Sequence, residues 1–392
     1  MTPHRATALM LNVGHALDHM FLLIFATAVT AIAADFGVAR WEDLMPYGVA
    51  AFVLFGIGSL PAGRLGDLWG RRPMMIVFFV GIGMSSIGVS AAQSPWQLAI
   101  ALALLGAFAS IYHPVGIPML LQNAAKPGLT IGINGLAGNL GLALAAIVTG
   151  FFVKHLGWRA AFVVPGALSI ACGLLFAWIA PREADAPARR KATQTIDTGI
   201  SLPHLLAIMT VASTVSGLVF NFSTNANYEM LADRLRDITR DPARLGTLLA
   251  VVYAVAACAQ VIVGRLIDRF PLKPLYLSII ATQGALFALS TQVGGWAFLV
   301  LQLLFMAFVF GAIPFTDAMI VRFVDDRLRS RVAGMRLAVS LGASSLAVWL
   351  IGPVVKQAGF GALLWLMAGC SLLSLLVVSR LPRTNAAPLV AP

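Results

Sequence analysis

The chain has 392 residues, of which 59% are apolar and only 11% are charged. Soluble domains are about 45–50% apolar and about 25% charged, so this composition excludes a water-soluble globule and indicates an integral membrane protein. The net charge of +11 comes from basic residues scattered over many short polar segments, which is typical of cytoplasmic loops and argues against a nucleic-acid partner. Long apolar runs also exclude an outer-membrane barrel, whose strands alternate in polarity over about 10 residues.

Twelve apolar segments are separated by turn residues and charged clusters, and each is long enough to cross a bilayer as a helix. In chain order they are 8–34, 44–62, 74–92, 96–122, 130–153, 160–180, 202–229, 244–263, 275–292, 296–321, 332–355 and 360–380. The one long polar connection, 181–201, lies at the centre of the chain. We therefore expect an all-α membrane protein with an N-terminal six-helix bundle (1–180), a cytoplasmic linker (181–201) and a C-terminal six-helix bundle (202–392).

An internal repeat indicates that the two bundles are pseudo-symmetric. The run Gly63-Arg64-Leu65-Gly66-Asp67 recurs as Gly264-Arg265-Leu266-Ile267-Asp268, 201 residues later. A second match, displaced by 202 residues, relates Gly150, Val153-Lys154 and Gly157 to Gly352, Val355-Lys356 and Gly359. Such repeats are common in secondary transporters. Lys and Arg residues concentrate on the side where both termini would lie, so we expect both termini in the cytoplasm.

The run from Gly63 to Pro73, between the second and third apolar segments, resembles the signature loop of the major facilitator superfamily. Its weaker copy at 264–274 occupies the equivalent place in the second half. The resemblance implies a transporter whose two bundles enclose a central path, with a loop that helps to hold the outward-facing state. The residues implied in gating are Gly63, Asp67, Gly70, Arg71, Arg72, Gly264 and Asp268. The basic residues could instead serve only to set the topology.

Two shorter stretches, Gly14–Met20 and Ser110–Pro114, resemble the fosmidomycin-resistance group of facilitators. Members of that group carry a comparable histidine and aspartate stretch in the first helix and a His-Pro in the fourth. This resemblance implies a proton-driven antiporter for drug efflux in a bacterial inner membrane. Two features that many exporters carry are missing here: segment 96–122 has no arginine, and segment 130–153 has no Gly-Pro pair. Uptake of the substrate therefore stays open as an alternative to export.

Ionisable side chains inside the predicted spans are the main candidates for a functional site, because they are costly at membrane depth. His15, Asp18 and His19 share one helix face, and Asn12 extends that face by one turn. His113, beside Tyr112, lies at a similar depth in the fourth segment, which faces the central cavity in the superfamily. A carboxylate beside histidines can carry protons. We predict a proton-coupling and substrate site here; the alternative is interhelical hydrogen bonding that only fixes the packing.

The second half offers further polar candidates. Asn221 and Asn225 lie on one stripe of the seventh segment, which predicts cavity or outer-gate residues unless the helix ends before Asn225. Asp317 and Arg336 lie near the cytoplasmic ends of the tenth and eleventh segments. They could form a structural ion pair or cytoplasmic gate, or Arg336 could bind an anionic group of the substrate.

No catalytic pattern competes with transport. The sequence has no Gly-x-Ser-x-Gly elbow, no phosphate-binding loop and no zinc-like spacing of His and Cys, so we expect no enzyme, no metal and no cofactor. Because the sequence has no phosphate-binding loop, we expect an ion gradient and not ATP to drive transport. Buried histidines favour protons as the coupling ion, and Asn12 with Asp18 keeps sodium as an alternative.

The sequence thus predicts a monomeric, proton-coupled secondary transporter that exports a small polar or anionic compound. The alternatives are a symporter for uptake of an organic anion and, from another class, a transporter-like membrane sensor.

Overall fold

A computed structural model of the chain describes residues 3–121, 127–182, 202–323 and 326–381, and all regular secondary structure in this part is helical. The first half consists of α1 (Pro3–Asp35), the short 3-10 turns η1 (Trp41–Asp43) and η2 (Met45–Gly48), α2 (Val49–Trp69), α3 (Arg71–Ser90), α4 (Pro95–Ala109), η3 (Tyr112–Gly116), α5 (Ile117–Leu121), α6 (Pro127–His155) and α7 (Trp158–Ile179). The second half consists of α8 (Leu202–Arg234), α9 (Pro242–Arg269), α10 (Leu272–Ser290), α11 (Gly295–Phe323) and α12 (Asp326–Val378).

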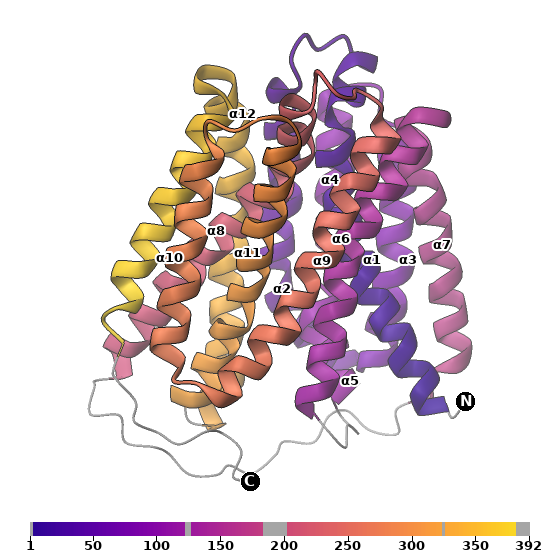
Figure 1. Ribbon diagram of the computed structural model, residues 1–392. Coiled ribbons are helices and arrows are strands. Elements are labelled where there is room, and N and C mark those ends of the chain that lie inside the picture. Colours follow the sequence, from indigo (N-terminus) through magenta and orange to yellow (C-terminus); the bar gives the residue numbers. More distant parts are fainter. Residues whose placement is uncertain (1–2, 122–126, 183–201, 324–325, 382–392) are drawn as a thin grey trace.

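Eleven stretches of the described chain are long and apolar enough to cross a membrane. The last, Ala338–Val378, has 41 residues, which as one helix would measure about 60 Å, twice the hydrocarbon thickness of a bilayer. It is interrupted at Gly359, whose backbone is not helical (φ 74°, ψ 177°), and Figure 1 shows the chain reversing direction there. It therefore supplies two spans, and the twelve predicted crossings are confirmed. The protein is a multi-pass membrane protein.

The helices of the two halves gather on different sides of the molecule. In Figure 1, α3 and α7 lie on the right, α8, α10 and α12 lie on the left, and the N-terminal end of α1 and the C-terminal end of α12 lie towards the bottom. The predicted linker 181–201 lies outside the described residues apart from Pro181 and Arg182. The division into bundles at 1–180 and 202–392 therefore stays a prediction.

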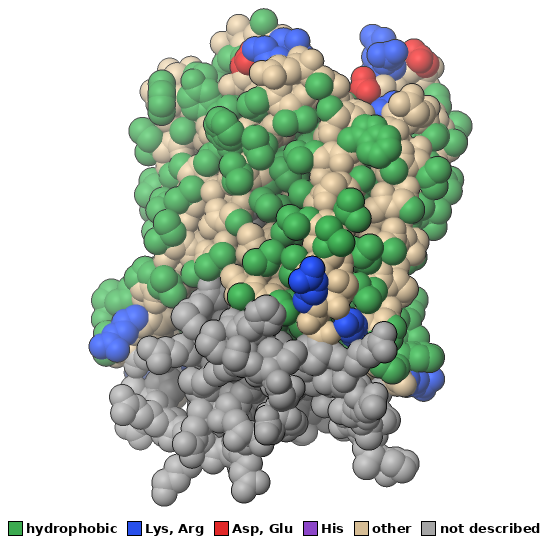
Figure 2. Space-filling view, turned by 90° about the vertical axis from the view of Figure 1, so that its left-hand side faces the viewer, with side chains coloured by type: hydrophobic (Ala, Val, Ile, Leu, Met, Phe, Trp, Pro, Cys, Tyr) green, Lys and Arg blue, Asp and Glu red, His purple; other side chains and the backbone are tan. Residues whose placement is uncertain are grey.

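The outer surface has the polarity expected of a membrane protein. Large apolar side chains such as Trp178 (84% exposed) and Trp96 (71% exposed) project outward from the spans. Figure 2 shows hydrophobic side chains over the middle of one face, with charged side chains gathered towards its two ends. In water an apolar surface of this extent would drive aggregation, so the lipid must cover it.

Three of the described polar contacts between the halves lie at the end of the molecule opposite the N-terminal end of α1. Lys154 donates to Asp241 (Nζ–Oδ2 2.6 Å), and Thr30 donates to Glu229 (Oγ1–Oε1 2.7 Å). Lys356 pairs with Asp43 in the same way. These contacts join α6 to the start of α9, α1 to α8 and α12 to η1. The two halves are therefore held together at this end.

Candidate functional site

Asp18 is the centre of the candidate site. It lies in the middle of α1 and is fully buried, and within the described part of the chain neither carboxylate oxygen has a hydrogen-bond partner. The nearest basic group is His113, whose Nδ1 lies 3.5 Å from Asp18 Oδ2. The structure thus brings together Asp18 and His113, as the sequence predicts.

A turn of π-helix, η3, positions His113. Pro114 has no backbone N–H to donate to the preceding turn, and the fourth span changes around it from α4 to η3 before resuming as α5. Such single turns are frequent at functional sites. Tyr112 is fully buried in the first half, whereas the side chain of His113 keeps 17% exposure. The π-helix was not predicted, and a proline alone does not signal it, because Pro61 and Pro165 lie inside regular helices.

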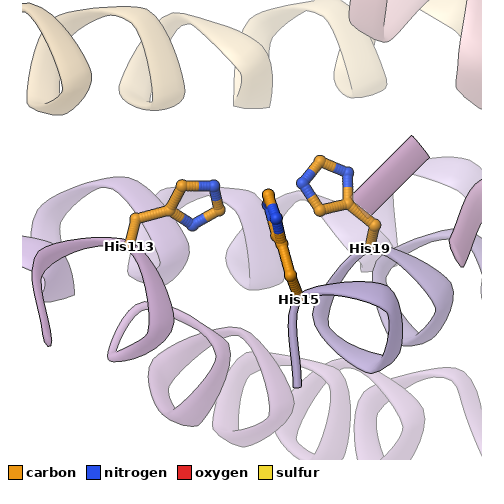
Figure 3. Close-up of side chains that lie close together, drawn as sticks. All are labelled: His15, His19 and His113. Carbon is orange, nitrogen blue, oxygen red and sulfur yellow. The ribbon is translucent and has the colours of Figure 1, made fainter. Parts of the chain in front are cut away.

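Three histidine rings lie against one another beside Asp18. The ring centroids of His15 and His19 are 4.8 Å apart, those of His15 and His113 are 5.1 Å apart, and those of His19 and His113 are 5.8 Å apart. Figure 3 shows the His15 ring between the other two, with all three projecting from the helices towards the same space. His15 also stacks on the Tyr112 ring at 4.7 Å. The four predicted aromatic and imidazole side chains therefore form one cluster.

Asn134 on α6 is a functional candidate that the sequence reasoning missed. Its Nδ2 donates to Asn12 Oδ1 (2.9 Å) and to the Tyr112 hydroxyl (2.7 Å), and its backbone carbonyl accepts from His15 Nδ1 (2.7 Å). Tyr112 in turn donates to the Leu11 carbonyl (2.9 Å). Asn12 and Tyr112 are thus tied into a buried network that fixes His15. An asparagine inside the fifth apolar segment was the available signal.

Glycines on the neighbouring helices leave space for the His15 and Tyr112 rings. A Cβ added at Gly138 of α6 would lie 2.7 Å from the His15 ring, and one at Gly116 would lie 2.9 Å from the Tyr112 ring. Gly141, one turn after Gly138, faces the carbonyl of Ala16 so closely that any side chain would collide with it. α6 therefore packs directly on the backbone of α1 beside the cluster, as small residues permit between membrane helices.

Asn221 and Asn225 lie apart from this cluster, on α8. Both are buried, and each amide donates to its own helix: Asn225 Nδ2 to the Asn221 carbonyl (3.1 Å) and Asn221 Nδ2 to the Gly217 carbonyl (2.9 Å). α8 continues to Arg234, so the alternative that the helix ends before Asn225 is wrong. A polar contact that joins the halves at the middle of the spans was not predicted: Asn139 of α6 donates to Gln260 of α9.

The signature run starting at Gly63 is not a loop over most of its length. Residues 63–69 form the last turns of α2, and only Gly70, with φ 95° and ψ 153°, separates α2 from α3. A Cβ at Gly63 would lie 3.3 Å from Pro114, and one at Gly66 would lie 2.9 Å from Val115. The two glycines therefore let α2 pack against η3, next to His113.

Arg71 and Arg72 of this run donate to backbone carbonyls of the first half. Arg71 Nη1 donates to the Pro118 carbonyl (3.3 Å), and Arg72 Nε donates to the Ala180 carbonyl (2.9 Å). Arg72 Nη2 also donates to the Ala177 carbonyl. Gly264 of the second copy lies in α9. The side chains of Asp67, Asp268, Asp317 and Arg336 lie outside the described part of the structure, so their predicted roles stay predictions.

Comparison with known proteins agrees with this architecture. Residues 11–231 match the family model described as Major Facilitator Superfamily. The chain is 32% identical over 178 residues to the "Probable actinorhodin transporter" of Streptomyces coelicolor (43% of this chain, 30% of that protein). It is 26% identical over 177 residues to the "Gallate transporter" of Pseudomonas putida (45% of this chain, 39% of that protein). The matches thus span about a third of the length of these relatives.

A solved structure extends the likeness to the whole chain. The xylose transporter XylE from E. coli, in an inward open conformation, superposes with a TM-score of 0.78 at 15% identity and covers 98% of both chains. At this identity the likeness concerns the fold alone. The family and its structural neighbours are transporters, not enzymes. With more than half of the sequence matched by the family model, the chain belongs to the Major Facilitator Superfamily.

Proposed function

We propose that the protein is a secondary active transporter that moves a small polar or anionic organic compound, driven by protons, in the direction of export. The observation that carries this proposal is the fully buried Asp18 carboxylate, which has no hydrogen bond within the described chain and lies 3.5 Å from His113. An isolated charge is very costly at this depth, so the side chain must be protonated or paired with a cation. Exchange of a proton between solvent and this pair would couple protonation to transport.

The position of the polar contacts between the two halves, at one end of the spans, supports an alternating-access cycle. The pairs Lys154–Asp241 and Thr30–Glu229 join the halves at the end opposite the N-terminal end of α1. The distribution of basic residues favours termini in the cytoplasm of a bacterium and hence this end outside the inner membrane. The described contacts then correspond to a state closed on the outside, and opening would require these pairs to break. We expect the monomer to carry out this cycle.

Export is supported by the resemblance of the first and fourth spans to the fosmidomycin-resistance group and by the partial likeness to an actinorhodin transporter. The second candidate is uptake of an organic anion by proton symport. The partial likeness to a gallate transporter favours it, as does the absence of an arginine from segment 96–122. Both candidates use the same buried cluster.

Transport by purified protein in lipid vesicles under an imposed pH gradient tests the proposal. Organic anions and antibiotics are offered on either side, and substrate flux and proton flux are recorded together. We expect Asp18→Asn to abolish proton-coupled flux, because the amide cannot take up and release the proton. Asp237→Asn is the matched control, since Asp237 is 90% exposed and should be silent. Wild-type proton flux through Asp18→Asn would overturn the proposal, and the sign of the flux decides between export and uptake.

A further inference from the structure

The three clustered histidines have the arrangement of a metal site. One ligand atom from each of His15, His19 and His113 can be chosen so that all three lie within 4.8 Å of one another. In a tetrahedral zinc site with Zn–N bonds of about 2.0–2.1 Å, neighbouring nitrogens are about 3.4 Å apart, so closure requires each ligand atom to move by only about 1 Å. His19 and His113 are partly exposed, which leaves their side chains room for this movement.

The orientation of His15 leaves its second nitrogen free for a ligand. Its Nδ1 lies 2.7 Å from the Asn134 carbonyl, which can only accept, so Nδ1 carries the proton. Its Nε2 then presents a lone pair, and within the described chain this buried atom has no hydrogen-bond partner. An imidazole that donates one N–H to a carbonyl or carboxylate and offers the other nitrogen is the usual form of a metal-binding histidine.

His113 lies beside a carboxylate at ion-pair distance. Its Nδ1 faces Asp18 Oδ2 at 3.5 Å, and in Figure 3 nitrogen-bearing edges of the His113 and His19 rings face one another across His15. Asp18 would orient His113 and offset part of the charge of a bound cation, which lowers the cost of placing that cation in a buried site.

We propose that His15, His19 and His113 together bind one divalent transition-metal ion of the Zn²⁺, Co²⁺ or Ni²⁺ type. Imidazole nitrogens favour these ions, whereas Mg²⁺ and Ca²⁺ require oxygen ligands. Three protein ligands leave a fourth position for water. The sequence indicated no metal because the third ligand comes from a different span. The inference goes beyond the proposed function and does not depend on it, since a proton-coupled transporter of organic compounds needs no ion at this place.

Equilibrium binding to purified protein tests the proposal without any transport step. The full chain is purified in detergent through a tag that contains no histidine, stripped of metal with a chelator and titrated with Co²⁺, whose visible absorption reports tetrahedral nitrogen ligation. We expect one Co²⁺ per chain with a Kd of about 1 μM or lower, and displacement of Co²⁺ by Zn²⁺. His15→Ala and His113→Ala should each weaken binding by more than about 100-fold, and Asp18→Asn by about 10–100-fold.

His155→Ala is the matched control, because His155 is an exposed histidine at the end of α6 and should leave affinity and stoichiometry unchanged. Thermal unfolding of each metal-free variant shows whether it is folded. If His15→Ala does not fold, His19→Ala replaces it, and X-ray absorption of the Zn²⁺-loaded wild type counts the imidazole ligands directly. A folded wild type that binds no Co²⁺, a bound ion with only oxygen ligands, or unchanged affinity in both histidine variants would overturn the proposal. None of these results would decide whether the protein carries out proton-coupled transport, which the vesicle assay measures separately.

Discussion

Lys154 and Lys356 make the same contact from equivalent positions in the two halves. Lys154 Nζ lies 2.6 Å from Asp241 Oδ2 at the start of α9, and Lys356 pairs with Asp43 in η1, shortly before α2. Each lysine follows a glycine, Gly150 or Gly352, that lies directly against a backbone carbonyl of the opposite half. The repeat seen in the sequence is therefore also a repeat of inter-half contacts, which we name the two lysine latches.

Reversing the charges of one latch tests its role. We expect Lys154→Asp and Asp241→Lys each to shift the protein towards the state open at this end by a few-fold, because each places like charges together. The double variant restores the pair with opposite polarity and should recover much of the closed state. Spin labels at cysteines introduced for His155 and Arg240, with the three native cysteines replaced, would report the distance between α6 and the start of α9. Equal opening in the double and single variants would contradict the latch.

The latch should be insensitive to pH over the physiological range. The hydrogen bond from Lys154 is the main reason that the pKa of Asp241 lies below its ordinary value of 3.8. A carboxyl group with a lowered pKa contributes to the paired state above its ordinary pKa and loses that contribution only as the pH falls through the lowered value. Distances from the same labelled protein should therefore stay constant between about pH 8 and about pH 5. Opening within that window would show that another group governs closure.

Two glycines of α6 should respond in opposite ways to the same substitution. Gly141→Ala places a methyl group against the Ala16 carbonyl of α1 and should lower the free energy of unfolding by about 1–3 kcal/mol. Gly132→Ala, earlier in α6, meets no described atom within 4 Å and should be neutral or stabilising by up to about 1 kcal/mol. Denaturant unfolding in detergent micelles measures both. A neutral Gly141→Ala would mean that α1 and α6 can move apart without loss.

Removing the Tyr112 hydroxyl should weaken both stability and transport. Tyr112→Phe leaves Asn134 without one acceptor and removes the side-chain donor that the Leu11 carbonyl has in addition to its helix bond, which should cost about 1–3 kcal/mol. Because Asn134 also holds His15, we expect transport to fall further than stability alone explains. Tyr253→Phe is the matched comparison, since that hydroxyl donates to the Thr224 carbonyl in the second half, away from the cluster.

The comparison rests on two readouts for each variant, which are the free energy of unfolding in detergent and substrate flux in vesicles. Tyr253→Phe should lower stability by a similar amount and leave flux per folded protein intact. Equal effects of both substitutions on flux would show that Tyr112 contributes only to packing.

Several features could be predicted from the sequence because they depend on local composition. Apolar length and turn residues located the spans, and the rule that ionisable groups are costly in lipid singled out His15, Asp18 and His19, which share one face of α1 because of helical periodicity. The meeting of His113 with Asp18 was predicted from equal depth and from the arrangement that the family resemblance implies. The extension of α2 through residues 63–69 was missed because glycines and charges suggested a loop, whereas α2 packs closely on η3 there.

The sequence by itself determined that this is a membrane protein of twelve spans with a repeated design, because hydrophobic length and residue spacing are properties of one segment at a time. Only the tertiary structure decided which polar atoms meet. The place of Asn134 between Asn12, Tyr112 and His15 depends on how α6 is rotated against α1, and the grouping of three histidines depends on the π-turn at Pro114. Such relations between distant segments follow from packing, which no single segment encodes.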